Sequence, residues 1–276
     1  MFYIVATPIG NKEEITLRAI SILKSCDSIY CEDTRHSGIL MQTYDIHTPL
    51  LRLDKFSEKQ KSQEIIQKLQ QGQNLALISD AGMPLISDPG NILLTQLIQN
   101  NLQFTVVSGA CALVNALVLS GLDTSRFFMA GFLPEKTKDK DILLSNIVNL
   151  PTTLIFYTPP HDIDDYLKYL HSKLGNRQVA IIREISKLYE EVIRFTLGAP
   201  PNFIHKGEMI IVIQGKIQTQ IPTDDQIIQE VHALQSTSCD KKQSIKQIAA
   251  KHNLPKSKVY NLIEKENEKT KNQQNI

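Results

Sequence analysis

The chain has 276 residues, of which 42% are apolar, so it is long enough for two domains of ordinary size and a further appendage. It has no tryptophan and only 6% aromatic residues, which disfavours a protein that stacks many bases on aromatic side chains. The net charge of +1 is unevenly spread, because nine lysines and three glutamates give +6 from residue 241 onward and leave −5 for residues 1–240.

Residues 1–120 alternate between short apolar runs and segments with helical spacing. The N-terminus has no basic segment and no long apolar stretch, so we expect neither a signal peptide nor a membrane span. Alternation of this kind predicts parallel strands joined by helices, and therefore a first α/β domain over residues 1–120. The predicted strands are 2–6, 28–31, 75–78 and 104–107, and the predicted helices are 17–23, 37–44, 58–71, 89–99 and 112–119, with Pro89 in the first turn of its helix.

Strand-like runs are more frequent in residues 121–217, which predicts a second α/β domain with a mixed sheet. The expected strands are 126–130, 153–157, 179–183, 192–196 and 209–214, and the expected helices are 142–148 and 163–174.

Residues 218–276 are predicted to be a linker and a basic helical tail. The polar segment 215–225, which contains Pro222, has the composition of a linker, and an amphipathic helix is expected at 227–234. Two further helices, around Ile245 and Val259, are separated by Asn253-Leu254-Pro255, as in a helix-turn-helix. The lysines favour contact with a nucleic acid. A solvated tail, or a helical hairpin that only packs on a partner subunit, remains open.

The four cysteines, Cys26, Cys31, Cys111 and Cys239, have no CxxC spacing and no histidine at the distance of a zinc ligand. We therefore expect reduced thiols in a cytoplasmic protein, with neither disulfides nor a metal site.

The segment 79–90, S-D-A-G-M-P-L-I-S-D-P-G, follows a predicted buried strand and precedes a helix. Ligands of α/β sheets bind where strands end, and glycines there let the backbone approach a ligand closely. Asp80 is a candidate hydrogen-bond acceptor for a ribose hydroxyl or an amine. The alternative interpretation is that the segment 79–90 is only an elaborate turn and binds no ligand.

Two other small-residue loops, 7–11 and 108–112, follow strands in the same way, which suggests one shared crevice. Neither GxGxxG nor GxxxxGK[ST] occurs, so the loops that hold dinucleotides and nucleoside triphosphates are missing. A ligand without phosphates fits better, and S-adenosylmethionine is one.

Six motifs in this order resemble the small-subunit rRNA methyltransferase I family of the tetrapyrrole-methylase superfamily. They are V-A-T-P-I-G-N (5–11), C-E-D-T-R-H (31–36), S-D-A-G-x-P-L-I-S-D-P-G (79–90), G-F-L-P (131–134), F-Y-x-x-P-H (156–161) and R-E-I-S-K (183–187). Together they cover about residues 1–215, and the helical tail resembles that family's C-terminal region. Three positions depart from the family's pattern: Met83 (usually Thr), Ser108 (usually Pro) and Asp162 (usually Arg).

The resemblance implies two α/β domains with a ligand cleft between them and S-adenosylmethionine as cofactor. It also implies a homodimer that methylates the ribose 2′-hydroxyl of a cytidine in the decoding region of small-subunit rRNA, with the rRNA or the 30S subunit as partner. The cofactor contacts expected from the loops and the motifs are Pro8, Gly10, Ser79, Asp80, Ala81, Gly82, Pro84, Cys111, Ala112, Tyr157 and Ala180.

A ribose hydroxyl is a poor nucleophile at neutral pH, so a nearby side chain must take its proton. Two polar clusters lie next to predicted strand ends, one around Glu32 and Arg35 and one around Glu184 and Lys187. Our hypothesis is that Arg35 and Lys187 hold RNA phosphate, and that Glu32 or Glu184 accepts the proton. Salt bridges that close the domain interface are the structural alternative for both clusters.

Residues 134–140, P-E-K-T-K-D-K, are interpreted as a mobile basic loop that grips RNA or is only solvated. Two other functions stay open: methylation of a tetrapyrrole or diphthamide-pathway substrate, and a non-catalytic rRNA-binding assembly factor. The basic tail disfavours the former, and the intact 79–90 segment disfavours the latter.

Overall fold

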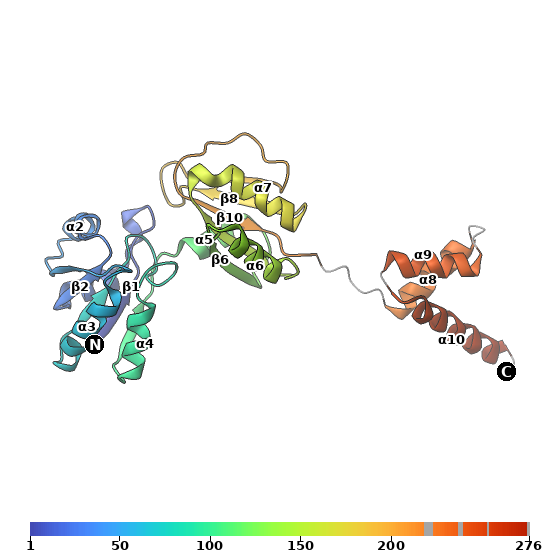
Figure 1. Cartoon of the computed structure of the whole chain (residues 1–276), viewed down its shortest axis with the longest axis horizontal. Coiled ribbons are helices and arrows are strands. Elements are labelled where there is room, and N and C mark those ends of the chain that lie inside the picture. Colours follow the sequence, from blue (N-terminus) through green and yellow to red (C-terminus); the bar gives the residue numbers. More distant parts are fainter. Residues whose placement is uncertain (218–222, 237–239, 253, 275–276) are drawn as a thin grey trace. The chain divides into compact units, whose positions relative to one another are not determined.

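The computed structural model describes residues 1–217, 223–236, 240–252 and 254–274. The chain divides into two compact units, Met1–Ile217 and Gln218–Ile276 (Figure 1). Of the predicted linker 215–225, residues 218–222 lie outside the described residues, and Asp224 already begins a helix.

The first sheet of the larger unit has five parallel strands in the order β3-β2-β4-β1-β5. The predicted strands are confirmed, whereas β3 was missed because three residues are too few to show a periodicity. The strands are β1 (Phe2–Val5), β2 (Ser28–Cys31), β3 (Leu50–Arg52), β4 (Leu75–Leu77) and β5 (Phe104–Val107), and the helices between them are η1 (Lys12–Glu14), α1 (Leu17–Ser25), α2 (Thr34–Thr43), α3 (Glu58–Gln70) and α4 (Asn91–Gln99).

Both faces of this sheet are buried, which explains why its strands are apolar throughout rather than alternating. Ile29 and Cys31 of β2 face a core that α1 and α2 complete. Tyr30 lies between them on the opposite face, in a core that α3 and α4 complete.

The second sheet is mixed, as the sequence predicts. Its order is β6-β7-β10-β8-β9, in which only β6 and β7 run parallel. Two helices, α6 and α7, pack on one face around Leu154, Phe156 and Ile211. The elements are β6 (Phe127–Phe132), α6 (Thr137–Ile147), β7 (Thr153–Thr158), η2 (Pro160–Asp162), α7 (Ile163–Leu174), β8 (Gln178–Arg183), β9 (Glu191–Thr196) and β10 (Met209–Ile213).

Helix α5 (Ala112–Ser120) follows the first sheet in sequence but packs on the other face of the second sheet. Its Leu113, Ala116 and Leu117 share one core with Ile182 and Ile210. The guanidinium of Arg194, on β9, donates to the carbonyls of Ser120 and Leu119 at the end of the helix. The domain border between residues 120 and 121 stays a prediction, and this packing favours a border before α5.

Two local predictions are wrong. Pro89 does not begin a helix, because Gly90 has a φ of 129° and α4 starts only at Asn91. Since Gly90 has no side chain that could cap the helix, the buried carboxylate of Glu58 accepts from the backbone N–H groups of Ile92 and Leu93, at 2.8 and 3.1 Å. The predicted loop 134–140 is helical from Thr137 on, where Asp139 stabilises the first turn of α6.

The smaller unit contains helices α8 (Asp224–Ser236), α9 (Lys241–Lys251) and α10 (Lys256–Gln274). They enclose a separate apolar core in which Ile227, Val231, Ile248, Val259 and Ile263 are buried. The predicted helices of this region are confirmed. Helix α10 extends well beyond the apolar residues around Val259 from which it was predicted. No helix in the described part of the chain is both long and apolar enough to cross a membrane.

Candidate functional site

The loops 7–11, 79–90 and 108–112 meet at one edge of the first sheet. They follow β1, β4 and β5, which are neighbouring parallel strands whose carboxyl ends lie together. The loop 7–11 after β1 is tied to the loop 79–90 after β4 by two backbone hydrogen bonds. Thr7 N donates to Gly82 O at 2.9 Å, and Gly82 N donates to Thr7 O at 3.1 Å. The hydroxyl of Thr7 donates to the carbonyl of Ser79 as well, at 3.1 Å.

The loop backbones pack so closely that only small residues fit. A Cβ on Gly82, where φ is 79°, would lie 2.9 Å from the side chain of Ile9, and a Cβ on Gly109 would lie 2.8 Å from that of Ala6. Leu85 and Ser87 also have positive φ angles, of 70° and 71°, which side-chain-bearing residues rarely adopt. Such strain persists only where surrounding structure imposes it, and it is typical of ligand-binding loops.

The loop after β8 brings the second sheet to the same place. A Cβ on Gly10 would lie 2.6 Å from Cγ of Lys187 and 2.8 Å from the carbonyl oxygen of Ile185. Glu184 and Ser186 in this loop have positive φ angles of 51° and 63°. The structure therefore brings the loops 7–11, 79–90 and 184–187 together.

Two cavities lie side by side among these loops, since both are lined by Ile9, Ala81 and Glu208. The first, of about 390 Å³, is mostly apolar and lies within the size range of small-molecule sites, roughly 300–1,000 Å³. Its other lining residues are Ile86, Ser87, Asp88, Ala112, Phe132, Tyr157, Thr158, Pro159, Ile182, Ile185, Met209 and Ile210. The second, of about 380 Å³, is more polar and is also lined by Pro8, Gly10, Lys12, His36, Ile39, Leu40, Asp80 and Lys187.

Asp88 is the titratable group that stands out in the apolar cavity. Burial raises its pKa to about 6, the carboxylates of Glu32 and Asp80 add to that effect, and Ser79 partly offsets it. A carboxyl group with such a pKa is ionised at neutral pH and still accepts a proton readily. Burial, with Cys111 and Asp88 nearby, raises the pKa of Tyr157 to about 12, so its phenol stays protonated and available as a donor.

Lys187 joins two carboxylates beside the second cavity. Its ammonium lies 2.9 Å from Glu184 Oε1 and 3.0 Å from Glu208 Oε2, and Glu184 Oε1 also accepts from the backbone N–H of Glu208 at 2.8 Å. Although burial acts in the opposite direction, these partners hold the pKa of the Glu184 carboxyl below its ordinary value. Glu184 therefore suits the orientation of Lys187 better than the removal of a proton.

Arg35 is largely exposed, with a guanidinium held by Asp33 through contacts of 2.7 and 3.1 Å. This pair holds the pKa of Asp33 well below its usual range. The backbone N–H of Asp33 donates to Asp80 at 3.4 Å, which links this cluster to the loop 79–90. Glu32 is exposed and lines a small crevice with Ser79, Pro84 and Asp88.

The residues predicted from the sequence are distributed around these cavities. Ala112 and Tyr157 line the apolar cavity; Pro8, Gly10, Asp80 and Lys187 line the polar one, and Ala81 lines both. Five of the predicted contacts are not among the lining residues of these two cavities: Ser79, Gly82, Pro84, Cys111 and Ala180. Ser79 and Pro84 line the small crevice instead, and Ala180 is buried in the core shared with α5.

The sequence reasoning missed Asp88, Ile182, Ile210 and Glu208. Asp88 belongs to the segment 79–90, and the signal that could have identified it is a second aspartate in a loop rich in Gly and Pro. The departing residue Asp162 lies 3.5 Å from His161, at the start of α7 and outside both cavity linings.

Cys26, Cys31 and Cys111 are free thiols, whereas Cys239 lies outside the described residues. Burial and the neighbouring Asp27 raise the pKa of Cys26 to about 11. Among the residues that the structure describes, no cluster of three or more His, Cys, Asp or Glu side chains is suited to a metal ion.

Comparison with known proteins gives a consistent picture. The family model for tetrapyrrole (corrin/porphyrin) methylases matches residues 1–201. The chain is 44% identical over 246 residues to the ribosomal RNA small subunit methyltransferase I of Pasteurella multocida, covering 86% of each chain. It is 37% identical over 273 residues to the protein of that name from Halalkalibacterium halodurans, covering 96% of this chain and 94% of the relative.

Two solved structures share the fold. A uroporphyrin-III-C-methyltransferase from Thermus thermophilus superposes with a TM-score of 0.55 at 18% identity, covering 77% of this chain and 93% of the other. A diphthine synthase gives a TM-score of 0.60 at 10% identity, with coverages of 78% and 89%. At these identities the likeness shows the fold alone.

Proposed function

The chain belongs to the tetrapyrrole methylase family and, within it, to the family of ribosomal RNA small subunit methyltransferase I, and on that premise we propose that it methylates small-subunit rRNA. The methyl donor is S-adenosylmethionine, and the acceptor is the ribose 2′-hydroxyl of a cytidine in the decoding region. The substrate is the rRNA or the 30S subunit, and the reaction takes place in the cytoplasm. The observation that supports this proposal most directly is the apolar cavity. The loops 7–11, 79–90 and 108–112 contribute to its lining, and Asp88 is one of the lining residues.

The apolar cavity fits S-adenosylmethionine. Ile9, Ile182 and Ile210 offer apolar walls to a planar adenine, and the protonated phenol of Tyr157 offers a hydrogen-bond donor. When bound, this cofactor supplies an electrophilic methyl group.

The protein's own contribution is to position the acceptor and to take its proton. The polar cavity, with Lys12, His36 and Lys187 in its lining, suits the phosphates that flank the target ribose. Because the two cavities share Ile9 and Ala81, an acceptor in one lies beside a donor in the other. Asp88 accepts the proton of the 2′-hydroxyl, and alignment of the two reacting groups supplies much of the rate.

The activity is tested by transfer of labelled methyl to small subunits from a strain that lacks the modification, followed by mapping of the modified ribose. A label on a base, or on a tetrapyrrole instead of RNA, would refute the proposal. Calorimetry with S-adenosylmethionine separates an enzyme from a non-catalytic assembly factor, because the latter would bind no cofactor.

Alanine at Glu32 or at Glu184 is expected to lower methyl transfer at least tenfold and to leave cofactor binding intact. Glu32 raises the pKa of Asp88, and Glu184 orients Lys187. E32Q should in addition move the acid limb of the pH–rate profile to lower pH, because the loss of its charge lowers the pKa of Asp88. Initial rates between pH 5 and 9 check both effects, with the exposed Glu135→Ala as control. Wild-type turnover in both alanine variants would contradict these roles.

A homodimer is part of the proposal. Exposed apolar side chains lie on the edge strands β5 and β6, at Val106, Phe127 and Phe128, and on α5, at Val114 and Val118. Edge strands with exposed apolar residues are surfaces on which a second chain can pack. Light scattering after size exclusion should give twice the chain mass for the wild type and the monomer mass for Val118→Asp, whose native side chain is 65% exposed. A monomeric wild type at micromolar concentration would refute the dimer.

A further inference from the structure

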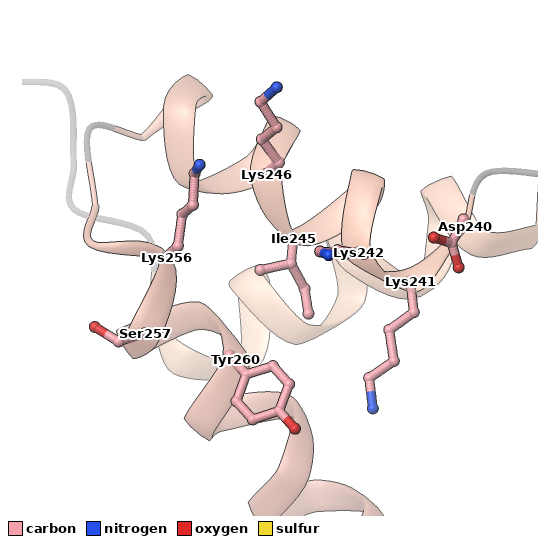
Figure 2. A pocket seen from close by; sticks show the side chains of 8 residues that line it. All are labelled: Asp240, Lys241, Lys242, Ile245, Lys246, Lys256, Ser257 and Tyr260. Carbon is pink, nitrogen blue, oxygen red and sulfur yellow. The ribbon is translucent and has the colours of Figure 1, made fainter.

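The smaller unit contains a cavity of its own, of about 520 Å³, between the first turns of α9 and α10 (Figure 2). Ile245 and the half-exposed ring of Tyr260 form its apolar surface. Four of the lining residues are lysines, against one carboxylate, so the cavity is strongly positive. The complete lining is Asp240, Lys241, Lys242, Ile245, Lys246, Lys256, Ser257 and Tyr260.

The lysines of this unit differ in their partners. Lys251, outside the cavity, lies 2.9 Å from Glu230, and Lys241, at the cavity edge, lies 2.6 Å from Glu264. In contrast, the exposed side chains of Lys242, Lys246 and Lys256 make no ion pair or hydrogen bond within the described part of the chain. Glu230 and Glu264 thus pair with Lys251 and Lys241, whereas three of the four cavity lysines have no carboxylate partner among the described residues.

The arrangement of the charges favours an extended anion. Figure 2 shows the side chains of Lys246, on α9, and Lys256, on α10, reaching toward the same side of the cavity, with Tyr260 one helical turn further along α10. Both helices begin at the cavity, and the first N–H groups of a helix add positive partial charge. The side chain of Asp240, the N-cap of α9, makes no capping hydrogen bond, but its carboxylate offsets part of this positive charge.

A single small anion would use only part of this surface, whereas a nucleic acid strand presents phosphates repeatedly and exposes bases that stack on aromatic rings. Lysine contacts to phosphate give affinity without reading sequence. The bases of an A-form duplex are paired and stacked on one another, so only a single strand offers a free base to the ring of Tyr260. We propose that this lysine-lined cavity binds the phosphodiester backbone of single-stranded RNA, in addition to the methylation site of the larger unit; the choice of RNA rests on the proposed function.

The test measures binding of the full chain to a fluorescently labelled single-stranded oligoribonucleotide over a series of salt concentrations, without cofactor. The variant K242Q/K246Q/K256Q is compared with K24Q/K59Q/K265Q, which removes the same charge from exposed lysines outside the cavity. The cavity variant should bind at least tenfold more weakly. Its slope of log affinity against log salt should be shallower by about 2, since each phosphate contact to a single strand contributes about 0.7. Y260A should lose about fivefold in affinity through lost stacking.

Equal losses in the two triple variants would overturn the proposal, because the effect would then be one of net charge. Competition by inorganic phosphate as strong as that by unlabelled RNA, at equal phosphate concentration, would also overturn it and indicate a small-anion site. Circular dichroism melting of each variant confirms that the helices are intact. Because binding is measured without methyl donor, a failure here is distinct from a failure to methylate RNA, which the wild-type transfer assay reports separately.

Discussion

Replacement of Asp88 by asparagine is expected to lower the rate of methyl transfer about 100-fold at pH 7.5, since a positioned general base contributes roughly 10²–10⁴-fold. Asparagine keeps the size and polarity of the side chain but cannot accept the 2′-hydroxyl proton. Cofactor affinity, measured by calorimetry, should change by less than about threefold. A large loss of cofactor affinity with an unchanged rate at saturation would instead make Asp88 a cofactor ligand.

The pH dependence gives a second readout of Asp88. Its pKa of about 6 predicts that the wild-type rate rises with pH through about 6, because only the ionised carboxylate accepts the proton. In D88N this rise should be absent between pH 5 and 7. A rise that persists in the variant would show that another group titrates there.

The D88N substitution, which lowers the rate of methyl transfer, should raise the folding stability of the protein at neutral pH. The pKa of Asp88 is 3.8 in an ordinary setting and about 6 in the folded chain, so the folded state binds more protons between these values. Stability contributed by this group therefore falls as pH rises from about 4 to 6, and the ionised carboxylate is destabilising above that range. D88N should melt at a higher temperature than wild type at pH 7.5 but not at pH 4, whereas the exposed Asp165→Asn should melt like wild type at both. Lower melting of D88N at pH 7.5 would attribute the lost activity to misfolding.

Alanine at Gly10 is expected to weaken cofactor binding at least tenfold and to destabilise the chain by about 1–3 kcal/mol through overpacking. The new Cβ would lie 2.8 Å from a backbone carbonyl, that of Ile185, and backbone yields less readily than a side chain. The loop 184–187 must then move away from the loop 7–11, which opens the place where the two cavities meet. Calorimetry and urea unfolding measure the two effects.

Gly38→Ala is the matched control for Gly10→Ala. Its Cβ would meet only Leu50 Cδ1, at 3.9 Å, and the residue lies within α2, where alanine is favoured over glycine by up to about 1 kcal/mol. We expect unchanged cofactor binding and equal or higher stability. Equal cofactor affinity in the two variants would show that the contact between the loops does not shape the site.

The sequence by itself determined the types of most elements and the position of the strand-end loops. Helical spacing and short β-branched runs are local patterns, so β1, β2, β5 and α7 could be placed closely from residues near in sequence. The density of Gly, Pro and Asp in segment 79–90 likewise predicted a ligand-binding loop, and Ala81, Ile86 and Asp88 of this loop line the apolar cavity. Met83, Ser108 and Asp162 depart from the family's pattern. The motif around each of these residues predicts a loop but does not predict what the residue contacts.

Only the tertiary structure decided which residues act together. Asp88 owes its raised pKa to burial and to the carboxylates of Glu32 and Asp80. Glu32 is distant in sequence, and Asp80 lies at the other end of a loop with positive φ angles. The pairing of Lys187 with Glu208 likewise depends on the return of the chain along β10. The tail is the clearest case: its total charge could be counted from the sequence, but which lysines are neutralised by glutamates, and which remain free to bind an anion, depends on how α8, α9 and α10 pack.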